Sequence, residues 1–160
     1  MSWPRPIRVV GVGSPQGDDA LAWEVIRMLQ QRHKGDNDIE FRVAEGGQRL
    51  LDVLEGEGTL LLIDALVPAG SPGAIRRFEW PNEWIEVLRP GSTHHLRPAA
   101  ALQLAATLGM LPPRVVIFGI EAASLDLRQG LSPAVAAAVP ELVRRIASEL
   151  QTKGNIESPL

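Results

Sequence analysis

Cysteine and tyrosine are both absent from the 160-residue chain. Without cysteine the chain has no disulfide, no thiol nucleophile and no zinc-finger or iron–sulfur ligands, which is typical of proteins kept in the reducing cytoplasm. A domain of this length buries roughly 70% of the surface that its unfolded chain exposes, so it can be stable without such cross-links. We therefore expect a single domain over residues 1–150 and a disordered tail over residues 151–160.

Long apolar runs and blocks of like charge are also missing. No stretch approaches the length of a membrane span, and the apolar run near the N-terminus is too short for a signal peptide. Sixteen basic and nineteen acidic residues give a net charge of −3 without a basic block. Nucleic acids and membranes are therefore not expected as partners, and nothing in the sequence demands more than a monomer.

Short apolar segments predict the strands of a mixed sheet. Near-continuous apolar character over residues 7–12, 59–64 and 114–120 is typical of parallel strands that are buried on both faces. The more amphipathic segment 39–44 suits an edge strand. Segment 73–80 follows a proline–glycine turn without a helical crossover, so we expect it to run antiparallel to the others.

Helical patterns alternate with these strands. Apolar residues recur at helical spacing after the aspartate pair at 18–19. A short helix is predicted over residues 48–56, closed by Gly56, and another over residues 96–109. The last helix should begin with Ser132 as N-cap and Pro133 at its first position, and Pro140 should kink or split it. This alternation predicts an α/β fold, a three-layer α/β/α sandwich around a mostly parallel, mixed sheet of about five strands.

The segment GVGSPQGDDALAW, residues 11–23, places three glycines and two aspartates between the first strand and the first helix. A dinucleotide-binding loop would have its third glycine where Gln16 stands, and Pro15 lacks an N–H that a pyrophosphate would need. The aspartates also put negative charge where a helix N-terminus would bind phosphate. Nucleotide binding is therefore disfavoured, and the simpler alternative is a tight turn in which an aspartate caps the helix.

Asp64 and a histidine pair turn this acidic loop into a candidate metal site. Asp64 ends a predicted buried strand, and the carboxyl end of such a strand faces the crevice where α/β proteins bind ligands. An aspartate that only caps local backbone is the alternative for Asp64. His94 and His95 stand at the start of a predicted helix, whereas His33 has no acidic neighbours and is expected to be exposed. Two carboxylates and an imidazole form a ligand set that nickel or zinc accepts.

Four blocks, in this order along the chain, resemble the hydrogenase maturation endopeptidases, which remove the C-terminal extension of the large subunit of nickel–iron hydrogenases. The blocks are GVGSPQGDDALA (residues 11–22), IDALVPAGSPGAIRRF (63–78), STHHLRPAAALQLAATLG (92–109) and VVIFGIEAASLDLRQGLSPAV (115–135). Together they span nearly the whole chain. The resemblance implies a phosphorylase/hydrolase-like α/β/α sandwich with one antiparallel strand.

The resemblance also implies a site and a reaction. By position, Asp19, Asp64 and His94 would be the metal-binding and catalytic residues, and His94 rather than His95 keeps the family's spacing from Ser92. The implied activity is that of a metal-dependent endopeptidase, grouped with the aspartic-type proteases, that cuts a hydrogenase large-subunit precursor in the cytoplasm. Nickel would arrive on the substrate, and no nucleotide would take part.

Two points stay open in the sequence. The first loop is shorter than is usual in the family, so either Asp18 or Asp19 could be the first ligand. As the spare carboxylate, Asp18 could act as a base or as a cap, and we favour the cap. Neither Ser14 nor Ser92 lies in a Gly-x-Ser-x-Gly elbow, so both are expected to be turn residues.

A different functional class is also compatible with the sequence. The chain could be a catalytically diverged metal- or partner-binding domain of the same fold, which the shortened loop favours and which Asp64 and His94 disfavour. Trp80 and Trp84 are expected to cover the sheet edge, with a docking face for the precursor as the alternative.

Overall fold

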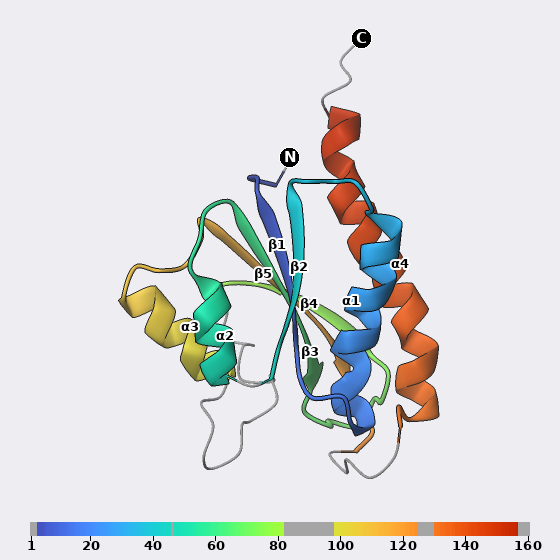
Figure 1. Cartoon of the computed structure of the whole chain (residues 1–160). Coiled ribbons are helices and arrows are strands. Elements are labelled where there is room, and N and C mark those ends of the chain that lie inside the picture. Colours follow the sequence, from blue (N-terminus) through green and yellow to red (C-terminus); the bar gives the residue numbers. More distant parts are fainter. Residues whose placement is uncertain (1–2, 46, 82–97, 125–129, 157–160) are drawn as a thin grey trace.

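The middle layer of the fold is a five-stranded sheet with strand order β2-β1-β3-β5-β4 (Figure 1). The computed structural model describes residues 3–45, 47–81, 98–124 and 130–156. β4 runs antiparallel to β5, and the other neighbouring strands pair in parallel. The strand bounds are β1 Ile7–Val12, β2 Ile39–Ala44, β3 Thr59–Leu66, β4 Ile75–Glu79 and β5 Arg114–Glu121. This arrangement confirms the predicted mixed sheet, its edge strand β2 and its antiparallel strand β4.

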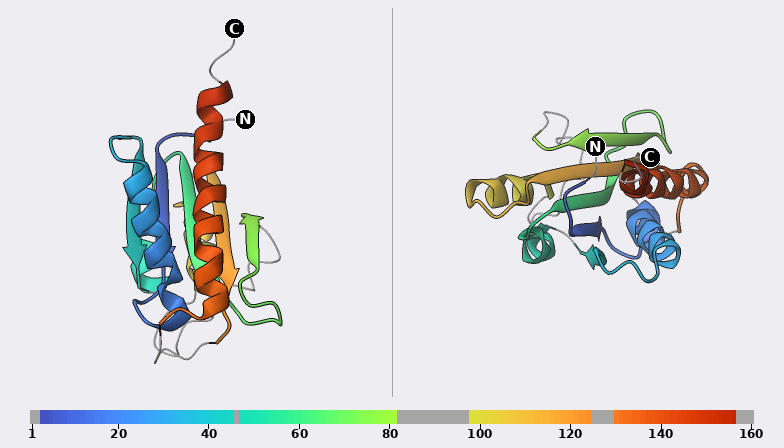
Figure 2. Two further views of the ribbon diagram at one scale, coloured as in Figure 1. Left: turned by 90° about the vertical axis from the view of Figure 1, so that its right-hand side faces the viewer. Right: turned by 90° about the horizontal axis from the view of Figure 1, so that it is seen from above.

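Helices cover both faces of the sheet, which confirms the three-layer sandwich (Figures 1 and 2). The helices α1 and α4 pack together on one face, and α2 and α3 pack together on the other. A short 3₁₀ helix, η1, leads directly into α1. The bounds are η1 Gly17–Ala20, α1 Leu21–Arg32, α2 Gly47–Leu54, α3 Pro98–Thr107 and α4 Pro133–Ile156.

Alternating side chains of the central strands form two separate cores. Every residue of β3 is buried, and successive side chains of a strand point to opposite faces of the sheet. Leu61 and Ile63 therefore belong to the core under α1 and α4, whereas Leu60 and Leu62 belong to the core under α2 and α3. Burial on both faces explains why these strands are almost continuously apolar.

Two elements extend beyond their predicted limits. β3 continues to Leu66, so Asp64 lies within the strand and not at its end. α4 is one helix that passes through Pro140 and reaches Ile156, so residues 151–156 are helical although we expected a disordered tail from residue 151. Pro140 and Ala136 are both exposed, so water can satisfy the Ala136 carbonyl that has lost its N–H partner. This hydration explains why the helix is not split.

The carboxyl ends of the four parallel strands lie at one edge of the sheet, at the bottom of Figure 1. η1 and the connections that follow β3 and β5 gather at the same edge. In an α/β sandwich this edge is where ligands bind. None of the helices among the described residues is long and apolar enough to cross a membrane.

Candidate functional site

Four buried acidic residues lie in the carboxyl-terminal halves of the parallel strands or just beyond them, and among the described residues they are the only buried acidic ones. Their exposed fractions are 4% for Asp18, 5% for Asp19, 2% for Asp64 and 1% for Glu121. A buried carboxylate is costly unless hydrogen bonds or a positive charge compensate for its lost hydration. Each of the four therefore requires a physical explanation.

Asp18 joins three parts of the chain and is a structural residue. Its Oδ1 accepts a hydrogen bond from the Ser132 N–H at 2.7 Å, and its Oδ2 accepts bonds from the Ala123 N–H at 2.9 Å and the Ser132 hydroxyl at 3.0 Å. Ser132 is the residue that precedes α4, and Ala123 follows β5. The carboxylate thus ties the glycine loop to the connection between β5 and α4, and it makes no capping bond to η1 or α1.

Asp19 lies on η1 and points back toward the glycine loop. Its Oδ2 accepts a hydrogen bond from the Ser14 N–H at 2.8 Å. A Cβ at Gly13 would lie 2.3 Å from the Asp19 carbonyl oxygen and 3.0 Å from Oδ1, and Gly13 has a φ of +145°. Only glycine fits at position 13 without displacing Asp19.

The other side of the loop is fixed by α1. The Trp23 indole N–H donates a hydrogen bond to the Gly13 carbonyl at 2.9 Å. A Cβ at Gly11 would lie 2.8 Å from Ile26 Cγ1 and 3.0 Å from the Ala22 carbonyl, so glycine lets α1 pack closely on β1. The glycines of this loop are therefore explained by helix packing and by the position of Asp19.

Asp64 lies at the centre of the sheet. It pairs with Gly119 of β5, and its neighbour Ile63 pairs with Gly11 of β1. Its Oδ1 accepts a hydrogen bond from the Ala65 N–H at 2.8 Å. Because Leu62 and Leu66 belong to the core under α2 and α3, alternation places the Asp64 side chain on that same face.

Glu121 is a buried acidic residue that the sequence analysis missed. Its Oε2 accepts hydrogen bonds from the Ala69 and Ser71 N–H groups at 2.9 and 2.6 Å, and its Oε1 lies 3.5 Å from the Arg76 guanidinium. Burial raises the pKa of Glu121, but the two N–H groups and Arg76 lower it by more, so the pKa lies below its ordinary value. Glu121 holds the connection between β3 and β4 beside the Asp64 strand. The sequence did contain a signal for Glu121, because it is an acidic residue directly after the apolar run of residues 114–120.

Several predicted site residues lie outside the described residues, namely Ser92, His94, His95 and Trp84. Within the described parts, no group of three or more histidine, cysteine, aspartate or glutamate residues is arranged to hold a metal ion. The assignment of Asp19, Asp64 and His94 as a ligand set therefore stays a prediction.

Three further predictions concern single residues. His33 is half-buried at the end of α1, where its Nδ1 lies 3.0 Å from the Leu29 carbonyl, although we expected it to be exposed. Trp80 packs against the core under α2 and α3, as expected for a residue that covers the sheet. Ser14 lies in the glycine loop, where its N–H donates a hydrogen bond to Asp19.

Comparison with known proteins gives a family match and several structural relatives. The family model for HycI, hydrogenase maturation protease, matches residues 23–149. The hydrogenase maturating endopeptidase HybD from E. coli is 25% identical, with a TM-score of 0.74 over 96% of this chain and 94% of that one. An endopeptidase from Escherichia coli, solved in solution, is 26% identical, with a TM-score of 0.78 over the same shares.

An archaeal protein is a third structural relative. The hydrogenase 2 maturation peptidase from a Thaumarchaeota archaeon is 25% identical, with a TM-score of 0.62 over 90% of this chain and 97% of that one. Comparison with curated protein sequences gives no significant match. The structural matches cover nearly the whole of both chains, so the likeness is one of entire domains.

Proposed function

Because this chain belongs to the hydrogenase maturation protease family, we propose that it removes the C-terminal extension of a nickel–iron hydrogenase large-subunit precursor after nickel has been loaded. The observation that carries the proposal is the pair of buried carboxylates, Asp19 and Asp64, at the carboxyl edge of the sheet. A crevice that buries two carboxylates favours a cation.

We assign Asp19, Asp64 and His94 to contact the nickel that the precursor carries. Each aspartate has one oxygen held by a backbone N–H, from Ser14 for Asp19 and from Ala65 for Asp64. These bonds fix how the carboxylates are oriented. His94 stands four residues before the first residue of α3, and α3 covers the face onto which Asp64 projects. The chain order therefore supports His94 as the third member.

Nickel bound to the precursor would act as a Lewis acid toward the scissile carbonyl or toward a water. The chain's own residues hold the assigned carboxylates in position. Asp18 fixes the loop that carries Asp19, and Glu121 fixes the connection that follows the Asp64 strand. Burying two carboxylates costs free energy, and a cation that lies against them offsets part of that cost. Nickel-loaded precursor would therefore bind more tightly than nickel-free precursor.

A catalytically diverged metal- or partner-binding domain is the second candidate function. The departures of the glycine loop from the family pattern support it, because they lie beside Asp19. Membership of the family does not separate a protease from such a relative. A binding domain would keep its affinity for the precursor but would not cut it.

Substitutions at the three assigned residues distinguish the two functions. Asp19→Asn, Asp64→Asn and His94→Ala should each lower the rate of precursor cleavage by at least 100-fold, with the extension followed by mass spectrometry. Asp52→Asn, on the exposed surface of α2, is the matched control and should cut at the wild-type rate. Wild-type protein that binds the loaded precursor without cutting it would favour the diverged binding domain. Equal cleavage by all variants would contradict the assigned residues.

The proposal places this reaction in the cytoplasm and assigns it to a monomer. Cleavage there would precede assembly of the hydrogenase, since the extension must be removed from a precursor that still exposes its C-terminus. Sedimentation of the purified protein tests the monomer directly, and fractionation of cells tests the compartment.

A further inference from the structure

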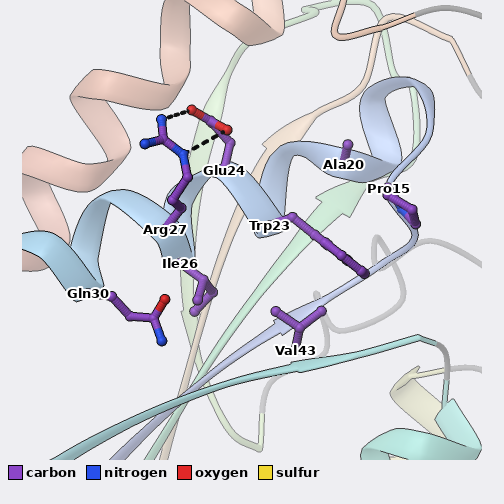
Figure 3. Close-up of a pocket in the computed structure, with 8 residues that line it drawn as sticks. All are labelled: Pro15, Ala20, Trp23, Glu24, Ile26, Arg27, Gln30 and Val43. Atoms are coloured by element: carbon purple, nitrogen blue, oxygen red, sulfur yellow. Dashed lines mark hydrogen bonds and ion pairs between the residues drawn. The ribbon is translucent and has the colours of Figure 1, made fainter.

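A groove of about 420 Å³ lies between α1 and the edge strand β2, beside the glycine loop (Figure 3). The residues that line it come from the loop, from α1 and from β2: Pro15, Ala20, Trp23, Glu24, Ile26, Arg27, Gln30 and Val43. Its volume is in the range of sites that bind ligands or single large side chains. Among the residues assigned to the metal, neither Asp19 nor Asp64 lines it.

The lining is mostly apolar, and the opposite charges of Glu24 and Arg27 leave it without a net charge. In Figure 3, Trp23 from α1 and Val43 from β2 project toward the same space, and Val43 is 38% exposed although it is apolar. At the rim, Arg27 forms an ion pair with Glu24, so the two charges offset each other. The groove therefore suits an uncharged, apolar group.

The groove is continuous with the proposed site. Pro15 and Ala20 lie on either side of Asp19 along the chain, and both line the groove. Trp23 also lines it and donates the hydrogen bond that holds the Gly13 carbonyl. A ligand in the groove would therefore contact the same loop that Asp19 contacts.

The open edge of the sheet indicates that the occupant is a polypeptide. β2 is the last strand in the sheet order and pairs with β1 alone among the described strands. An exposed strand edge presents a row of N–H and C=O groups that can bind an extended segment. Val43 of this edge strand lines the groove, so one extended segment can pair with β2 and place a side chain between Trp23 and Val43.

We infer that this groove binds an extended segment of the hydrogenase large-subunit precursor, with an apolar side chain seated between α1 and β2. The inference rests on the proposed function for the identity of the partner. The segment would reach the loop that carries Asp19 from the outer side of the sheet. The groove would then contribute affinity for the precursor, and the residues that face the metal would contribute the cleavage step.

The test compares substitutions at Val43 with a matched exposed position on the opposite side of the molecule. Val43→Lys places a charge at the groove, Val43→Leu keeps it apolar, and Leu104→Lys changes a residue on α3 that is 42% exposed. Binding is measured by calorimetry with nickel-free precursor, which the proposed function leaves uncut. Cleavage is measured with nickel-loaded precursor as kcat and KM.

We expect Val43→Lys to weaken binding and raise KM by at least 10-fold, with kcat kept, while Val43→Leu and Leu104→Lys behave as wild type. Equal dissociation constants for wild type and Val43→Lys would overturn the inference. Loss of self-association in Val43→Lys, seen by sedimentation, would also overturn it, because a second copy would then fill the groove. If wild type binds the precursor but does not cut loaded precursor, the proposed function fails. The dissociation constant of Val43→Lys relative to that of wild type, measured with nickel-free precursor, then still tests the groove.

Discussion

Replacing Asp18 by asparagine should destabilise the fold substantially, although the substitution keeps the size and shape of the side chain. Both carboxylate oxygens accept a hydrogen bond from a backbone N–H, Oδ1 from that of Ser132 and Oδ2 from that of Ala123. An asparagine has one oxygen and one NH₂ group. Whichever way the amide is turned, its NH₂ group faces one of these N–H groups, so the amide cannot satisfy both.

The expected cost follows from these contacts. A hydrogen bond to a charged group contributes about 1.5–3 kcal/mol, and a buried donor without an acceptor costs about 1–3 kcal/mol. Because one good bond survives and some relaxation is possible, we expect Asp18→Asn to lower the free energy of unfolding by about 2–4 kcal/mol. For a chain of this size, that loss lowers Tm by roughly 5–15 °C.

Urea unfolding followed by circular dichroism measures this loss, with Tm from a thermal scan as a second value. Asp52→Asn is the matched control, because Asp52 is exposed on α2 and surface substitutions usually change stability by less than about 0.5 kcal/mol. If Asp18→Asn and Asp52→Asn unfold at the same urea concentration, Asp18 is not the cross-link described above. A loss of stability without a change in m, the slope of the unfolding free energy against urea concentration, would show that the folded state still forms.

Three further predictions concern single positions. Gly13→Ala should cost about 2–5 kcal/mol, because its Cβ would overlap the Asp19 carbonyl at a φ of +145°; unfolding at the wild-type midpoint would show that the loop relaxes freely. Because folding lowers the pKa of Glu121, the stability that this ionised group contributes is present above the ordinary glutamate pKa and is lost as pH falls through the lowered one. The difference in unfolding free energy between wild type and Glu121→Gln should therefore be largest above about pH 5 and shrink toward pH 3, and a constant difference across this range would contradict the assignment. Pro140→Ala should stabilise the chain by about 1–3 kcal/mol, because it restores a helix hydrogen bond within α4, and a destabilised variant in thermal scans would show that the proline is accommodated without cost.

Much of the fold could be predicted because burial on both faces leaves a simple pattern. The segments that became β1, β3 and β5 are nearly continuous apolar runs, and β2 alternates as an edge strand does. The antiparallel β4 could be predicted because no helix separates it from β3. The end of β3 was misjudged because Ala65 and Leu66 are followed by a proline–glycine turn, which hides the last two residues of the strand.

The roles of the acidic residues could be predicted only in part. A sequence shows that Asp18 and Asp19 are adjacent, but it does not show that they point to different partners. Asp18 binds residues more than one hundred positions away, at Ala123 and Ser132, and such contacts depend on the packing of α4 against α1. Glu121 was missed for the same reason, because its partners Ala69 and Ser71 follow another strand.

The most direct test of the proposed activity uses purified protein with nickel-loaded and nickel-free large-subunit precursor from the same genome. Mass spectrometry of the precursor's C-terminus records whether the extension has been removed. We predict cleavage of the loaded precursor alone, with loss of that cleavage in Asp64→Asn and no loss in Asp52→Asn. Equal cleavage of the two precursors would contradict recognition of nickel by Asp19, Asp64 and His94, and no cleavage of a verified loaded precursor would contradict the protease itself.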